Sequence, residues 1–166
     1  ETERKTHGKV VFTVTELANA SGSAPHVLNV ELDRLCKQGI IVRYARGRYG
    51  LPDAVTPERL LPYLDTHAYI TGAFALHRHN RITQIPVEIT CFTNRRHNRS
   101  RVRETPLGRF TFVCVKSPVY APPDEGALAS PEQALCDYVF LMRRRGVAPS
   151  GQVTFRNLRH LDTKAL

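Results

Sequence analysis

The chain has 166 residues, of which 42% are hydrophobic and 23% charged, and this composition excludes an intrinsically disordered chain. No apolar run approaches the roughly 18 residues of a membrane-spanning helix and the N-terminus is polar, so we expect a cytoplasmic protein without membrane contact. Because 24 Lys and Arg residues stand against 15 Asp and Glu, the formal net charge is +9, which attracts polyanions such as nucleic acids.

The cysteines give no sign of a metal site. They lie far apart in apolar segments and form no C-x-x-C pair, whereas structural zinc needs ligands clustered at short spacings. We therefore expect buried free thiols at Cys36, Cys91, Cys114 and Cys136, with no metal and no cofactor.

The first predicted helix is short. After the apolar run at 10–12, Thr13 or Thr15 can cap a helix over 16–20, and Gly22 is typical of a helix end. A second, longer helix follows over about 24–38. Ser23 offers an N-cap hydroxyl and Pro25 suits the first helical turn, because a proline lacks the N–H that would remain unpaired there.

The second helix has two distinct faces. Leu28, Leu32 and Leu35 recur at helical spacing and predict a stripe that packs into a core. The opposite face is either a solvated surface or, as we expect, one that enters the major groove of DNA, where N-terminal helix residues lie nearest the base edges. Its candidate DNA contacts are Ser23, His26, Asn29, Val30, Asp33 and Lys37, with His26 and Asn29 as the main candidates for base contacts.

Two β-rich runs at 40–44 and 48–52 flank a short connection containing Gly47 and predict a hairpin. Arg43, Arg46 and Arg48 crowd its expected tip, where guanidinium groups can reach phosphates or a narrow minor groove. Two helices joined by a glycine turn and followed by a basic hairpin are typical of a winged helix-turn-helix. We therefore predict that residues 1–52 form a domain that binds double-stranded DNA.

Residues 53–166 are expected to form a second, α+β domain with a smaller sheet. Helices are predicted at about 57–64 and 73–77. Apolar residues alternate in the runs 87–94 and 109–115, which we expect to pair as an antiparallel hairpin. The fold class expected for the whole chain is therefore α+β.

An arginine-rich stretch, residues 94–103, lies between these two runs and contains no acidic residue; the first acid after it is Glu104. Such a run either binds an anion, which favours a phosphate-binding loop, or forms a solvated hairpin tip. If the stretch is a phosphate-binding loop, its candidate DNA-binding residues are Arg95, Arg96, Arg99, Arg101 and Arg103.

A core helix is predicted from Ser130 to the arginines before Gly146. Asp137 in it is expected to meet a nearby arginine or to make a polar contact at the helix face. Residues 153–158 look like the opening of another helix, so we expect the natural chain to continue beyond Leu166.

Several segments, taken in order over about residues 10–145, resemble AbiEi-type antitoxins and their relatives. These are the predicted winged helix ending in GRY at 47–49, YITGAFAL at 69–76, TQIP at 83–86 before VEIT at 87–90, the arginine-rich stretch, and SPEQALCD at 130–137. The resemblance implies a repressor that binds the promoter of its own operon through inverted repeats, with two copies per operator. It also implies that the C-terminal domain counters a nucleotidyltransferase-like toxin.

No nucleophile, P-loop or dinucleotide motif is present, so we expect a binding protein and no enzyme. Two alternatives remain open. A Mg²⁺-dependent nuclease would use Glu88 and Asp65, but no second acid and lysine follow Glu88 at the required spacing. A regulator that senses a small effector would line a pocket with aromatic side chains, for which the candidates are Tyr63, Tyr69, Phe74 and Phe92.

Overall fold

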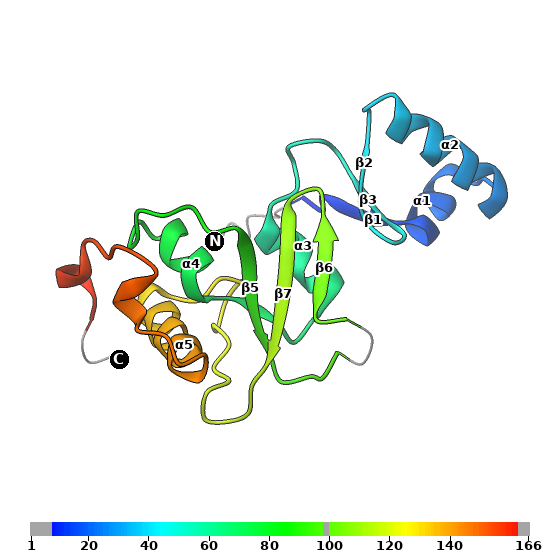
Figure 1. Cartoon of the computed structure of the whole chain (residues 1–166). Helices are drawn as coiled ribbons and strands as arrows, with labels where there is room; N and C mark the ends of the chain where they lie inside the picture. Colours follow the sequence, from blue (N-terminus) through cyan, green and yellow to red (C-terminus); the bar gives the residue numbers. More distant parts are fainter. Residues whose placement is uncertain (1–7, 98–99, 163–166) are drawn as a thin grey trace, which may run out of the picture. The chain divides into compact units, whose positions relative to one another are not determined.

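The computed structural model describes residues 8–97 and 100–162 and has the expected α+β class, with helices and two sheets (Figure 1). The chain divides into two compact units, residues 1–60 and 61–166. The boundary expected near residue 53 therefore comes earlier than this division, which falls inside helix α3 (Pro57–Leu64). Within the described ranges, no helix is both long and apolar enough to cross a membrane.

The N-terminal unit combines two helices with a small antiparallel sheet whose strand order is β1-β3-β2. Its elements in chain order are β1 (Val11–Thr13), α1 (Val14–Ser21), α2 (Pro25–Lys37), β2 (Val42–Ala45) and β3 (Arg48–Gly50). The apolar run that precedes α1 is thus a strand, which pairs with the second strand of the β2–β3 hairpin.

Local capping sets both ends of α1. The Thr13 hydroxyl accepts a hydrogen bond from the Glu16 N–H at 3.1 Å, and the Glu16 carboxylate accepts one from the Thr13 N–H at 2.9 Å. This reciprocal pair is a capping box, so of the two predicted caps Thr13 is the one used. Gly22 ends the helix with φ +68°, a backbone conformation that glycine adopts without steric cost.

The predicted N-cap of α2 is wrong by one residue. Ala24, in an extended conformation, is the N-cap and makes no side-chain cap, while the Ser23 N–H donates to the Ser21 hydroxyl at 3.3 Å. The cause is Pro25, because its ring disfavours helical geometry in the residue before it and moves the helix start to the proline itself.

The predicted stripe of α2 is confirmed. Leu28 and Leu32 are buried at 7% and 3% exposure, and Leu35 is half-buried. Tyr44 of β2 is also buried, and its hydroxyl donates to the Leu51 carbonyl at 3.1 Å. Helix α2 is therefore attached to the unit by one face only.

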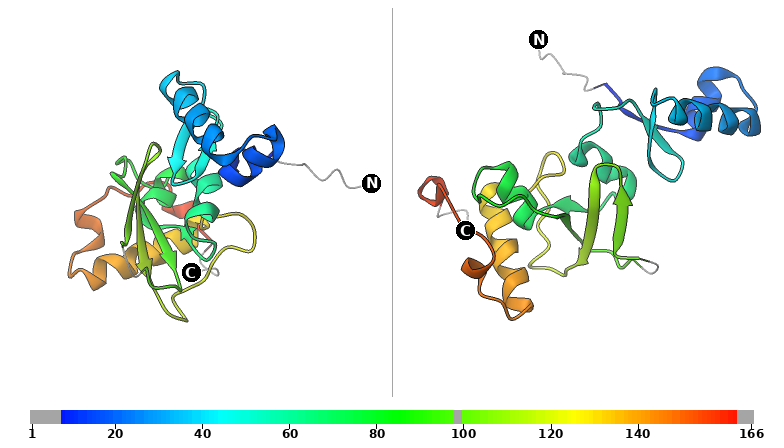
Figure 2. Two further views of the ribbon diagram at one scale, coloured as in Figure 1. Left: turned by 90° about the vertical axis from the view of Figure 1, so that its right-hand side faces the viewer. Right: turned by 45° about the horizontal axis from the view of Figure 1, so that its top comes forward.

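The second unit is built on a four-stranded sheet with the order β4-β5-β7-β6. Its strands and main helices are β4 (Tyr69–Ile70), α4 (Gly72–Arg78), β5 (Glu88–Thr93), β6 (Val102–Thr105), β7 (Gly108–Cys114) and α5 (Pro131–Arg144). Helices α4 and α5 lie side by side next to β5 (Figure 2), and Phe92 of β5 meets Phe140 of α5 with ring centroids 6.1 Å apart.

The prediction that 87–94 and 109–115 form an antiparallel hairpin is wrong. Strands β5 and β7 are parallel, with Ile89 opposite Phe110. The connection between them contains β6, which lies at the sheet edge and forms the antiparallel hairpin with β7. Because β6 reverses the chain once before β7, β7 returns in the direction of β5.

The predicted helix at 153–158 is wrong as well. Phe155 forms an antiparallel bridge with Ile82, and the Arg156 N–H donates to the Arg81 carbonyl at 2.8 Å. The Phe155 ring packs edge-on against Tyr138 at 5.8 Å. Backbone pairing with the 81–83 segment thus replaces helical hydrogen bonds. Among the described residues that follow α5, the helical segments are two short 3-10 helices, η1 (Pro149–Gly151) and η2 (Leu158–His160).

All four cysteines are free, as expected, but only Cys91 is buried, and the other three are half-buried. Burial raises the pKa of the Cys91 thiol well above its ordinary value.

Candidate nucleic-acid interface

The outer face of α2 carries the side chains that the sequence predicted there. Leu28 and Leu32 occupy the inner face, and 71% of the Val30 surface is accessible to solvent. The exposed residues are His26, Asn29, Val30, Asp33 and Lys37, whereas Ser23 is half-buried in the turn before the helix. The structure therefore brings the candidate contacts of α2 together on one accessible surface.

The cationic side chains of α2 each lie beside an acidic side chain of the same helix. Lys37 Nζ lies 2.6 Å from Asp33 Oδ2, and Arg34 pairs at 3.8 Å with a glutamate one turn before it, Glu31. The hydrogen bond to Asp33 and the charge of that carboxylate raise the pKa of Lys37. Because the two cations of α2 lie beside carboxylates of the same helix, the outer face of α2 carries little net charge.

Positive charge in the N-terminal unit gathers on the β2–β3 hairpin. Arg46 and Gly47 form its turn, with Gly47 at φ +68°. Arg46 is exposed, while Arg48 is half-buried and its guanidinium lies 3.4 Å from the Gly47 carbonyl oxygen. Arg43 is exposed as well but sits opposite Tyr49, so it lies along the strand and not at the tip as predicted.

The arginine-rich stretch is only in part a loop. Arg95, Arg96 and Arg101 are exposed, and Arg99 lies outside the described residues. Arg103 belongs to β6, where it is half-buried and its guanidinium donates to the Ser100 carbonyl at 2.7 Å. The assignment of Arg103 to the loop is therefore wrong, because the end of the run is a strand with its own backbone partners.

A buried carboxylate fixes the start of this stretch. Asp65, whose side chain is only 4% exposed, accepts hydrogen bonds from the Thr93 hydroxyl at 2.7 Å and from the His67 N–H at 2.8 Å. His97 Nε2 lies 2.9 Å from the same carboxylate, and the His97 ring packs against Phe112 with ring centroids 4.5 Å apart and an interplanar angle of 32°. Thr93 at the end of β5 and His97 in the arginine-rich stretch therefore both contact the Asp65 carboxylate.

The environment of Asp65 favours its charged form. Burial alone would raise the pKa of Asp65, but the hydrogen bonds from His67, Thr93 and His97, with the charge of His97, lower the pKa overall. From the sequence, Asp65 is a candidate only for a metal ligand. Its partners are distant in sequence, and neither periodicity nor a local motif indicates such a cluster.

A second buried carboxylate joins two of the segments that carry the family resemblance. Asp137 of α5 is 2% exposed and accepts hydrogen bonds from the hydroxyls of Tyr69 at 3.1 Å and Thr71 at 2.7 Å, and from the Gln133 amide at 2.7 Å. These partners are neutral, so of the two expected alternatives the structure shows the polar contact, and the expected arginine partner is wrong. Burial raises the pKa of Asp137 although the three hydrogen bonds oppose this effect.

The residues named for the two alternative functions have structural partners. Glu88 accepts a hydrogen bond from the Thr111 hydroxyl at 2.7 Å and lies 4.0 Å from an Arg145 nitrogen. Tyr69 and Phe92, named for an effector pocket, are buried in the core and meet edge-on at 6.0 Å.

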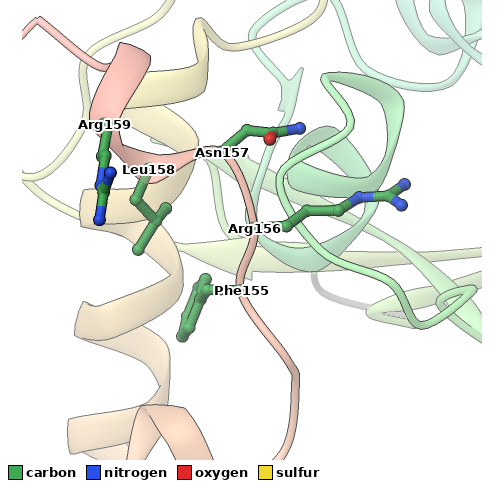
Figure 3. A pocket seen from close by; sticks show the side chains of 5 residues that line it. All are labelled: Phe155, Arg156, Asn157, Leu158 and Arg159. Atoms are coloured by element: carbon green, nitrogen blue, oxygen red, sulfur yellow. The ribbon is translucent and has the colours of Figure 1, made fainter.

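An open pocket lies elsewhere, on the segment after α5 (Figure 3). It is lined by Phe155, Arg156, Asn157, Leu158 and Arg159. The Arg156 side chain is hydrogen-bonded to Asn80, and the Arg156 and Arg159 side chains extend apart in Figure 3. The two cations therefore do not converge on one point.

A scan against models of protein families finds no match to this chain, and a search of curated proteins finds no relative.

The Asp65 cluster predicts a pH-dependent stability. Asp65→Asn removes the charge that its three donors stabilise and should lower the free energy of unfolding by about 1.5–3 kcal/mol at neutral pH. Because the pKa of Asp65 is lower in the folded chain, its contribution is present above the ordinary aspartate pKa of about 4 and is lost as the pH falls through the folded value.

Urea denaturation of the full chain between pH 7 and pH 3, followed by circular dichroism, measures this effect. The difference between the parent and Asp65→Asn should shrink below about pH 4, and Asp124→Asn, at an exposed position, should match the parent throughout. A difference that stays constant across the range would contradict the assigned role.

Proposed function

We propose that the N-terminal unit is a winged helix-turn-helix and that the protein is a repressor of transcription that binds double-stranded DNA. The observation that carries this proposal is the position of α2, which is held by Leu28 and Leu32 and presents its other face to solvent. An α-helix with its side chains is about 10–12 Å wide and the major groove is about 12 Å wide, so such a face fits the groove.

The elements around α2 support the same function. Helix α1 precedes it across a short turn at 22–24, and a hairpin with two exposed arginines follows it. In helix-turn-helix proteins the second helix enters the major groove while the first crosses the backbone. The hairpin then serves as the wing, with Arg43 and Arg46 at phosphates or in the minor groove.

The charges suggest a division of roles. Base contacts give specificity and phosphate contacts position the protein. Because the cations of α2 pair within the helix, we assign base contacts to its neutral side chains, above all Asn29, and phosphate contacts to the wing. Arg95, Arg96 and Arg101 of the second unit add a further exposed cationic surface for phosphates or for an acidic protein.

We further propose that the protein is an antitoxin that represses its own operon and counters a nucleotidyltransferase-like toxin. The support is the resemblance of this chain to AbiEi-type antitoxins. Two of the segments that carry the resemblance, 69–76 and 130–137, meet at the buried Asp137. A regulator of the same DNA that senses a small effector is the alternative, in which the second unit binds a ligand and no toxin.

The DNA-binding role predicts a sequence-specific complex with the DNA upstream of the protein's own gene. Asn29→Ala combined with Arg46→Ala should weaken this complex about 5- to 150-fold because position 29 can no longer bind its base, and should reduce the salt slope by about 1 because one phosphate is no longer neutralised. Fluorescence anisotropy at several salt concentrations measures both quantities.

The matched control for this pair is Gln152→Ala combined with Arg144→Ala, which removes one amide and one cation from exposed positions of the second unit. This control should retain the sequence preference of the parent. Equal binding to any duplex, by parent and variants alike, would show that only the general positive charge acts and would reject the proposal.

The arginine-rich stretch has its own test. If Arg95 and Arg96 bind phosphates, then Arg95→Gln combined with Arg96→Gln should reduce the salt slope by about 0.9 for each phosphate that is no longer neutralised. Arg143→Gln combined with Arg144→Gln removes the same charge from the end of α5 and should change the slope less. Equal slopes for the two pairs would leave Arg95 and Arg96 as a solvated surface.

The antitoxin role predicts that the full chain restores growth to cells expressing the toxin encoded beside its gene. The Asn29→Ala, Arg46→Ala variant should restore growth equally well, because the proposed neutralisation does not use the DNA-binding face. Growth arrest that persists with the parent protein would reject the antitoxin role and leave the DNA-binding proposal intact.

A further inference from the structure

We infer that α2 reads A·T base pairs, with the Asn29 carboxamide on adenine and the methyl groups of Val30 and Val27 on thymine methyls. This inference rests on the proposed DNA-binding function and names the bases that its recognition helix selects. Helix α2 exposes two valines and an asparagine, and its two cations lie beside carboxylates of the same helix.

Two apolar side chains stand out on the exposed face. Val30 is 71% and Val27 53% exposed, and their spacing of three residues makes them neighbours on the helix surface. Valine is a poorer helix former than Ala, Lys or Glu, and exposed apolar surface does not favour solubility. Exposed apolar side chains also occur elsewhere in the chain, for example at Val87, so what distinguishes Val27 and Val30 is that they lie together on the face of α2 that is proposed to meet DNA.

A thymine is the base that an exposed valine fits. In the major groove only thymine carries a methyl group, at C5, and apolar side chains pack against it. Adenine presents an acceptor at N7 and a donor at N6, to which an asparagine amide can bind with two hydrogen bonds. Asn29 and Val30 are both exposed, so α2 offers one side chain suited to adenine and one suited to thymine.

The charges of α2 argue against a guanine-reading helix. Guanine is read mainly by Arg or Lys at O6 and N7. The two cations of α2, Arg34 and Lys37, pair with Glu31 and Asp33 and lie in the C-terminal half of the helix. Base contacts in helix-turn-helix complexes come mainly from the N-terminal residues of the recognition helix, where α2 places Val27, Asn29 and Val30.

The small exposed surface of Val27 and Val30 argues against a protein partner at this site. Each side of a stable protein–protein interface buries about 800 Å². Two partly exposed valines supply only a small part of such an area, and charged side chains adjoin them on α2. Two thymine methyl groups, by contrast, are of a size that two valines can cover.

The test begins by selecting duplexes with the full-length protein from a random pool. Each thymine of the selected sequence is then replaced in turn by deoxyuridine, which keeps the base pair and lacks only the methyl group. Removal of a methyl group that a valine covers should weaken binding by the parent about fourfold. The same replacement should change binding by Val30→Ala or by Val27→Ala much less, because the partner of that methyl is gone.

Val87→Ala is the matched control, because it makes the same change at a 93% exposed position of the second unit and should respond to deoxyuridine as the parent does. In addition, Asn29→Ala should lose the preference for adenine at one position of the selected sequence, by about 5- to 150-fold.

The outcomes separate this inference from the function it rests on. A selected sequence whose deoxyuridine effects are equal in the parent, Val30→Ala and Val27→Ala would overturn the A·T readout and leave specific DNA binding in place. Selection of no sequence at all would overturn both. A thymine effect that disappears in a valine variant, together with an adenine preference that needs Asn29, would establish the readout.

Discussion

The burial of Leu28 and Leu32 is the constraint on which the proposed interface depends. An α-helix has one rotational setting in which a stripe of leucines lies in a core, and that setting determines which side chains point outward. Here it places Asn29 and Val30 in solvent while the Thr13 capping box and Gly22 fix the helix that precedes α2. Each leucine buried in this way contributes about 1.5–3 kcal/mol, so the exposed face is set by the stability of the unit.

The second unit contains two buried carboxylates, Asp65 and the more deeply buried Asp137, whose pKa values shift in opposite directions. Both accept three hydrogen bonds, yet the pKa of Asp65 is lowered and that of Asp137 is raised. Asp65 has an imidazole among its partners, whereas Asp137 meets only hydroxyls and an amide. Asp65 thereby holds the start of an exposed cationic stretch, and Asp137 joins β4 and the residue after it to α5 inside the core.

Local chemistry predicted the elements that depend on local signals. The caps, glycines and leucine spacing located α1 and α2 within one or two residues, and the outer face of α2 was identified correctly. The errors concern long-range pairing. The arginines at and before β6 masked its strand pattern in the sequence, so the parallel pairing of β5 with β7 could not be inferred. The hydrogen bonds to Asp65 come from residues 28 and 32 positions away in the sequence, which no local pattern indicates. At 153–158, pairing with the segment around Ile82 overrode a helical pattern.

Side-chain NMR of the full chain, titrated with a DNA duplex that it selects, tests the central claim most directly, because side-chain signals distinguish the two faces of α2. We expect large shifts for the Asn29 amide and the Val30 methyl groups and small shifts for the methyl groups of Leu28 and Leu32, which remain in the core. Shifts confined to residues of the second unit, with the Asn29 and Val30 signals unchanged, would contradict the assignment of α2 as the recognition helix.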